Sequence, residues 1–128
     1  MDQRTDFVDE TTRVERTNKA NQIVNNVQAA QKLLEKYPNR IPILVATTQQ
    51  ITLTKNKFLC PRDSTIGYFQ CVLRKYITNL RPEEAIFIYF GSSNAIMTTT
   101  TRMSQVYAGH CGQDQFLHAF VTIENTFG

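Results

Sequence analysis

The sequence predicts one small α+β domain in which helices pack on a single sheet, and three observations lead to this prediction. The chain has 128 residues, 41% of them hydrophobic and 20% charged, which is typical of one globular domain. Its apolar patterning follows the order helix, strand, strand, helix, strand, short helix, strand. That order contains two hairpin-compatible pairs of strands and one crossover helix, and no internal repeat is visible.

The N-terminal part is expected to hold an arm and one helix. Residues 1–17 are polar with isolated apolar residues, so a mobile arm and a weakly docked segment both remain open. After Asn18, apolar residues recur at alternating spacings of four and three, which places them on one face of a helix. These residues are Ile23, Val27, Ala30, Leu34 and Tyr37. Pro38 is expected to end the helix near Lys36 or Tyr37.

Two paired strands are expected next. Residues 40–46 are branched and apolar, as in a buried strand, and residues 57–60 have the pattern of its partner. Pro61 lacks the N–H that a sheet requires, so this second strand ends there or lies at a sheet edge. An edge strand is where an extended peptide can add.

A second helix should follow, capped by Asp63, Ser64 or Thr65 and ending before Pro82. Arg74 is expected to face outward with Lys75. The apolar stripe of this helix consists of Ile66, Phe69, Val72, Leu73, Tyr76 and Ile77.

The remaining elements complete the sheet. Residues 85–90 are continuously apolar, which predicts a central strand covered on both faces. A short helix carrying Met103, Val106 and Tyr107 should stop at Gly109 and Gly112, and a last strand should span residues 116–122.

The net charge of +3 is unevenly distributed. Residues 41–81 carry six basic side chains and one acidic, whereas residues 82–128 carry one basic and four acidic. Nucleic acid, an anionic lipid surface and an acidic peptide all suit such a basic segment. Nucleic acid is disfavoured because the basic residues lack interleaved exposed aromatics. An acidic peptide that adds as a further strand fits best, because the basic segment includes the edge strand.

The residues that could carry catalysis or bind a metal do not form a recognisable site. His110 and Cys111 are adjacent in sequence, which directs their side chains apart. Together with Cys60 and Cys71, Cys111 leaves an odd number of cysteines without a CxxC pair, so neither disulfides nor zinc are expected. Cys71 is expected to be a small buried residue on the apolar half of its helix. With no membrane-spanning stretch or signal segment, a soluble, non-secreted protein is expected.

Four segments of distinctive sequence occur in order: KYPNRIP at 36–42, KFLCP at 57–61, IGYF at 66–69 with LRK at 73–75, and ENTFG at 124–128. Together they resemble the autophagy ubiquitin-like modifiers, the family of GABARAP and the microtubule-associated protein light chains. The similarity covers about residues 30–128. It implies a ubiquitin-like β-grasp domain with its C-terminal tail at residues 38–128, a four-stranded mixed sheet with a crossover helix. The arm and helical extension at 1–37 would belong to the same compact unit.

The resemblance also implies a function. Members are joined through a C-terminal glycine to phosphatidylethanolamine on autophagic membranes and bind cargo receptors and adaptors there. Gly128 would be the conjugated residue, and Phe127 would be recognised by the processing and activating enzymes. The chain would be a monomer in the cytoplasm and on autophagosomal membranes, with no catalytic activity, metal, cofactor other than the covalent lipid, or nucleic-acid partner. Its other partners would be a processing protease and the conjugating enzyme.

Two hydrophobic pockets follow from the resemblance. The first, for the aromatic residue of a short motif, would be formed by Leu33, Pro42, Leu44, Lys57, Leu59 and Phe116. The second, for its aliphatic residue, would be formed by Phe58, Cys60, Pro61, Ser64, Phe69 and Val72. Arg74 would contact the acidic residues that flank the motif.

Three departures from the family pattern bear on ligand preference and on one loop. Ser64 replaces an aliphatic residue, Ala29 an acidic one, and Met97-Thr98 a pair of prolines. Two alternatives remain open: a modifier attached to a protein lysine, and a peptide-binding adaptor that is never conjugated. The sequence also leaves open whether Gly128 is encoded last or exposed by proteolysis.

Overall fold

The order of helices and strands is the one that the sequence predicts. The structure is a computed structural model that describes the backbone of residues 3–123 and the side chains of residues 18–123. Gly128 and Phe127 therefore lie outside the described residues. The elements are α1 (Gln3–Lys36), β1 (Arg40–Thr47), β2 (Lys57–Pro61), α2 (Ile66–Arg74), β3 (Phe87–Phe90), α3 (Met103–His110) and β4 (Leu117–Thr122).

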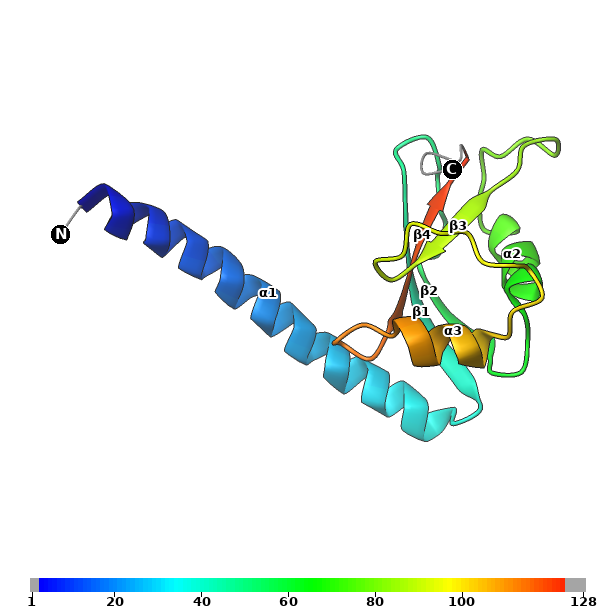
Figure 1. Ribbon diagram of the computed structural model, residues 1–128, viewed down its shortest axis with the longest axis horizontal. Helices are drawn as coiled ribbons and strands as arrows, with labels where there is room; N and C mark the ends of the chain where they lie inside the picture. The colour runs from blue at the N-terminus through cyan, green and yellow to red at the C-terminus, as the bar shows by residue number, and fades with distance from the viewer. Residues whose placement is uncertain (1–2, 124–128) are drawn as a thin grey trace.

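The four strands form one mixed sheet in the order β2-β1-β4-β3 (Figure 1). β1 pairs with β2 antiparallel and with β4 parallel, and β3 pairs with β4 antiparallel. Helix α2 lies in the connection between the two antiparallel pairs. This arrangement confirms the β-grasp sheet and crossover helix that the resemblance implies.

The core lies between the sheet and α2. Ile41 pairs with Cys60 and Ile43 with Phe58, and paired residues point to the same face of a sheet. All four are buried, together with Phe69 and Leu73 of α2. The rings of Phe58 and Phe69 meet edge to face with centroids 5.8 Å apart, a favourable aromatic geometry.

The sequence predicted the edge position correctly for one strand and wrongly for another. β2 lies at an edge and ends at Pro61, as expected. The apolar run at 85–90 forms only β3, which lies at the opposite edge and is not central. Ile88, Tyr89 and Phe90 are nevertheless buried in succession, so both faces of β3 are covered as predicted. Both faces of a strand can be covered by packed side chains even when only one of its edges pairs with another strand.

Helix α2 begins where predicted and ends early. The Thr65 side chain accepts a hydrogen bond from the Tyr68 N–H, which satisfies a free donor of the first turn. The helix ends at Arg74, yet Ile77 beyond it is still buried. The prediction for Cys71 is wrong, because its side chain is exposed. A nine-residue helix buries a narrow stripe, and Cys71 lies beside that stripe.

Helix α1 is one continuous helix and ends at Lys36, before Pro38, as predicted. It begins at Gln3, well before the apolar pattern starts, and its N-terminal part extends away from the sheet (Figure 1). Ala30 is completely buried, whereas Ile23 is exposed, because only the C-terminal part of α1 covers the sheet. None of the helices within the described part of the chain has the length and apolar character that a bilayer crossing requires.

Helix α3 buries Met103 and Val106, as its predicted apolar side requires. Gly109 lies inside its last turn, and the helix ends at His110, with Gly112 just beyond. Gly91, in the turn after β3, has a φ of 62°. Glycine suits this left-handed conformation, and a Cβ there would lie 3.1 Å from the His110 carbonyl oxygen.

Candidate functional site

The two pockets predicted from the resemblance fall on opposite faces of β2. Successive residues of a strand point to opposite sides, so Lys57 and Leu59 share one face while Phe58 and Cys60 share the other. Leu59 pairs with Pro42 and Lys57 pairs with Leu44 across β1. The structure therefore brings four residues of the predicted first pocket onto one face of the sheet.

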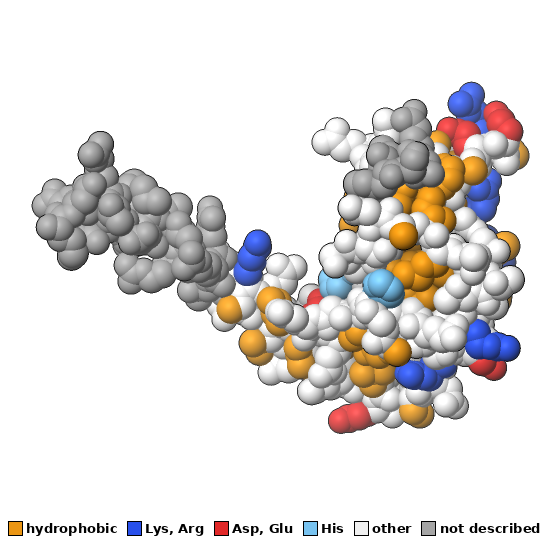
Figure 2. All heavy atoms as spheres, viewed as in Figure 1, with side chains coloured by type: hydrophobic (Ala, Val, Ile, Leu, Met, Phe, Trp, Pro, Cys, Tyr) orange, Lys and Arg blue, Asp and Glu red, His pale blue; other side chains and the backbone are white. Residues whose placement is uncertain are grey.

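A cavity of about 350 Å³ opens at this edge of β2, beside α1, and Phe58 also contributes to its lining. Its walls include three of the predicted residues, Leu33 from α1 and Lys57 and Leu59 from β2. Phe116 is buried, and the Lys57 Nζ lies 5.9 Å from the centre of its ring. Pro42 is also completely buried, and neither of these residues lines the cavity, nor does Leu44. Hydrophobic side chains gather where the described part of α1 meets the sheet (Figure 2).

Two further cations line this cavity, and the sequence analysis did not assign them to it. Lys55 places its Nζ 5.0 Å from the ring centre of Phe58. Arg40 donates from Nη1 to the Leu59 carbonyl oxygen at 3.3 Å, which holds its guanidinium beside β2. From the sequence, Lys55 was recognisable only as a basic residue near Lys57. With Lys57 they make this edge strongly cationic, which favours an acidic partner.

Half of the residues of the second predicted pocket belong to the core. Phe58, Cys60 and Phe69 are buried, whereas Pro61, Ser64 and Val72 are half-buried. The Ser64 hydroxyl donates to the Pro61 carbonyl oxygen at 2.6 Å and lies 3.1 Å from the Cys60 Sγ. Burial raises the pKa of the Cys60 thiol, so it stays neutral. The half-buried residues are therefore the part that a ligand can reach.

Arg74 is less free than the sequence suggested. Its side chain is half-buried and does not simply face outward. The guanidinium donates from Nη1 to the Glu84 carbonyl oxygen at 2.9 Å and from Nη2 to the Pro82 carbonyl oxygen at 3.4 Å. Arg74 thus holds the segment before β3 in place, and its contact with an acidic peptide stays a prediction.

The outer edge of β2 offers backbone groups to a further strand. The Val45 N–H donates to the Asn56 carbonyl oxygen at 2.8 Å, and the Arg62 N–H donates to the Asn39 carbonyl oxygen at 3.0 Å. Alternate residues of β2 therefore turn their backbone groups towards β1. The intervening residues, Lys57 and Leu59, direct theirs to the outer side, where the Leu59 carbonyl oxygen already accepts one hydrogen bond from the Arg40 side chain. An extended chain could pair there between the two predicted pockets.

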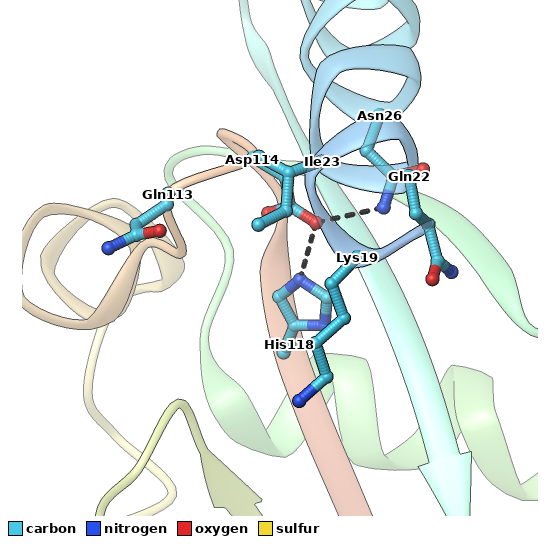
Figure 3. Close-up of a pocket in the computed structure, with 7 residues that line it drawn as sticks. All are labelled: Lys19, Gln22, Ile23, Asn26, Gln113, Asp114 and His118. Atoms are coloured by element: carbon cyan, nitrogen blue, oxygen red, sulfur yellow. Dashed lines mark hydrogen bonds and ion pairs between the residues drawn. The ribbon is translucent and has the colours of Figure 1, made fainter. Parts of the chain in front are cut away.

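A second cavity, of about 380 Å³, lies between α1 and the start of β4 (Figure 3). Its centre is Asp114, whose side chain is only 7% exposed. The Oδ2 atom accepts from the Asn26 Nδ2 at 3.0 Å and from the His118 Nε2 at 2.8 Å, and Oδ1 accepts from the Phe116 N–H at 3.1 Å. Lys19, Gln22, Ile23 and Gln113 complete the lining.

Opposing effects act on the pKa of Asp114. Burial raises it, but hydrogen bonds from His118, Asn26 and the Phe116 N–H together lower it below the ordinary value. Gly112 makes this approach possible, because a Cβ there would lie 2.9 Å from the Asp114 Oδ1. The result is a carboxylate that stays ionised and joins α1 to the rest of the domain.

Replacing Asp114 by Asn should lower the free energy of unfolding in a pH-dependent way. Because the folded-state pKa is lowered, the carboxylate stabilises the fold above the unfolded value of about 4. This contribution is lost as the pH falls through the lower folded-state pKa. Urea unfolding of both proteins at pH 7 and at pH 2 should therefore show a difference that shrinks in acid. A difference of the same size at both pH values would contradict this, and the exposed Asp63→Asn is the control.

Across the described residues, no three His, Cys, Asp or Glu side chains come together as a metal site requires. The Cys111 thiol donates to the Gly112 carbonyl oxygen at 3.4 Å.

The mixed sheet, its crossover helix and the cationic cavity beside an open strand edge define a ubiquitin-like protein with a surface suited to an extended peptide. A family model described as "Autophagy protein Atg8 ubiquitin like" matches residues 25–128. The chain belongs to this family and is an autophagy ubiquitin-like modifier.

Known relatives agree with this assignment. Autophagy-related protein 8 of Mycosarcoma maydis is 39% identical over 102 residues, which cover 77% of this chain and 84% of that protein. Autophagy-related protein 8d of Arabidopsis thaliana is 40% identical, covering 77% and 82%. Among solved structures, ATG8 of Trypanosoma brucei superposes with a TM-score of 0.69 at 28% identity, covering 78% of this chain and 86% of that one. Plasmodium falciparum Atg8 in complex with an Atg3 peptide also gives 0.69, at 26% identity, covering 80% and 90%.

Proposed function

We propose that this modifier is conjugated through the Gly128 carboxylate to phosphatidylethanolamine on autophagosomal membranes. There it binds cargo receptors and adaptors that carry short aromatic-x-x-aliphatic motifs preceded by acidic residues. It occurs in the cytoplasm and on the autophagosomal membrane. The observation that carries the peptide-binding part is the cavity of about 350 Å³, lined by Leu33 and three cations, at the open edge of β2.

The spacing of the motif suits the geometry of β2. In an extended peptide, residues three positions apart point to opposite faces and lie about 10 Å apart. A peptide that pairs with the outer side of β2 would direct its aromatic residue into the cavity beside Leu33. Its aliphatic residue would then point to the other face, towards Ser64 and Val72. Acidic residues before the motif would meet Arg40, Lys55 and Lys57.

The chemistry of conjugation requires only a carboxylate from this chain. An activating enzyme would join the Gly128 carboxylate to AMP, with loss of pyrophosphate from ATP. A cysteine thiolate of the conjugating enzyme would displace AMP, and the lipid amine would displace that thiolate to leave an amide. Two observations support this: the family match extends through Gly128, and a solved relative is in complex with an Atg3 peptide. The chain itself contributes docking surfaces and no catalytic group.

The lipid would provide lasting attachment to the membrane. Each buried methylene contributes about 0.8 kcal/mol, so the two acyl chains of phosphatidylethanolamine hold a protein where one chain would be marginal. Soluble and membrane-bound pools of the protein should therefore coexist.

Replacing Lys57 by Glu should weaken peptide binding about tenfold at low salt, because the reversed charge repels the acidic residues of the motif. Lys57 is the sharper probe because its side chain is exposed, whereas Arg74 also holds the segment before β3. The probe is a synthetic peptide with several glutamates followed by Trp-x-x-Leu, and calorimetry at low and high salt measures its affinity.

The control is Lys75→Glu, which makes the same charge change at an exposed position that does not line the cavity. It should change affinity little. The loss for Lys57→Glu should shrink at high salt, since exposed charges are screened over about 8–10 Å at ordinary ionic strength. Equal peptide affinities for Lys57→Glu and Lys75→Glu would contradict the proposal that the peptide binds at this cavity.

A further inference from the structure

Asn26 and Leu33 lie on the same face of α1. They are seven residues apart, which is close to two full turns, and Ala30 between them is completely buried against the domain. Leu33 lines the cavity proposed to take the aromatic residue. Asn26 lines the second cavity and donates to Asp114 (Figure 3).

Asp114 joins two parts of the proposed peptide site. Through Oδ2 it holds Asn26, and with it the helix that carries Leu33. Through Oδ1 it accepts the Phe116 N–H, so it also holds the residue whose ring lies under Lys57. His118 binds the same carboxylate from β4 at 2.8 Å. Asp114 is nearly buried, and the hydrogen bonds from the Phe116 N–H and from His118 hold its carboxylate in place. It is therefore a rigid acceptor for Asn26.

We propose that the Asn26–Asp114 hydrogen bond positions α1 so that Leu33 closes the peptide cavity, which makes Asn26 a positioning residue for peptide binding. This inference rests on the proposed peptide-binding function. Asn26 is remote from the cavity lining itself and acts through the helix.

The expected change in peptide affinity follows from the fraction of molecules in which α1 is seated, that is, held against the domain by the Asn26–Asp114 hydrogen bond. An affinity measured for a protein that is only partly in its binding-competent state is reduced by that fraction. Removing the hydrogen bond should lower the seated fraction. By thermodynamic reciprocity, a bound peptide should hold α1 more firmly against the domain.

Replacing Asn26 by Ala should weaken binding of the Trp-x-x-Leu peptide about three- to tenfold, since the competent fraction falls. The matched control is Asn25→Ala, at an exposed position one residue earlier on the same helix. Both variants change helix propensity equally, so a difference between them reports the bond to Asp114. Calorimetry gives the affinities, and amide hydrogen exchange in residues 26–33 reports the seating of α1, which peptide should slow in the unaltered chain.

An exchanged pair separates positioning from simple stabilisation. Asn26→Asp alone places two carboxylates together and should weaken binding further, whereas Asn26→Asp with Asp114→Asn restores a donor and an acceptor and should recover most of the affinity. A purely structural role would lower the urea midpoint and leave the affinity of the folded protein unchanged.

Equal peptide affinities for Asn26→Ala and Asn25→Ala would overturn the inference alone, as would failure of the exchanged pair to recover binding. Absence of binding by the unaltered chain would instead overturn the proposed peptide-binding function, and the inference with it.

Discussion

Deleting Gly128 is expected to abolish attachment to phosphatidylethanolamine completely. The carboxylate that should form the amide would then belong to Phe127, whose bulky side chain obstructs a narrow conjugating site. The assay is flotation of the protein with phosphatidylethanolamine liposomes, the two partner enzymes and ATP, together with a gel shift. Peptide binding should persist, because the cavity beside Leu33 and Lys57 is formed by other parts of the chain.

A matched glycine controls for effects of substitution on the fold. Gly109→Ala adds a methyl group inside α3 where nothing lies within 4 Å, so it should conjugate normally, while Gly128→Ala should not. Normal flotation of the Gly128 deletion would refute conjugation at this residue. Mass spectrometry of the cellular C-terminus separates the alternatives, since it detects a lipid amide, a branched lysine peptide or a free glycine.

Replacing Leu73 by Ala should lower the free energy of unfolding more than the other stability variants proposed above and below. Leu73 is completely buried between α2 and the sheet. Buried Leu→Ala changes cost about 2–5 kcal/mol, because apolar contacts are lost and a cavity remains. Against a total of about 5–15 kcal/mol for a typical domain, this shifts the denaturant midpoint strongly.

The same substitution at a half-buried position provides the comparison. Leu34 lies on α1, where Leu→Ala changes helix propensity in the same way but removes less buried surface. Urea unfolding should give a clearly smaller loss for Leu34→Ala. Losses of equal size would show that the core does not lie where the structure places it.

The second pocket and the edge strands show where sequence patterns stop being informative. A run of apolar residues reports that both faces of a strand are covered, and Ile88, Tyr89 and Phe90 are indeed buried in succession. It does not report which strands pair, so the edge position of β3 was not predictable from residues 85–90. Likewise, the apolar character of Phe58 and Phe69 did not distinguish a ligand pocket from the core in which they lie.

The candidate site was predictable in its strand residues and not in its cross-chain contacts. Strand alternation places Lys57 and Leu59 on one face whatever the rest of the chain does. The meeting of Asn26 with Asp114 joins residues 88 positions apart, and no local pattern contains it. Arg74 was recognisable as a cation, but its carbonyl partners depend on how the segment before β3 returns past α2.

The sequence by itself determined the order of the elements, a helix cap within residues 63–65, the end of α1 before Pro38, and an end or an edge position for β2 at Pro61. Each of these depends on the geometry and hydrogen-bonding capacity of a few neighbouring residues. Only the tertiary structure decided the strand order, the exposure of Cys71 and the seating of α1 on Asp114. These depend on contacts between distant segments, whose free energies are set by burial and pairing in three dimensions and not by local propensity.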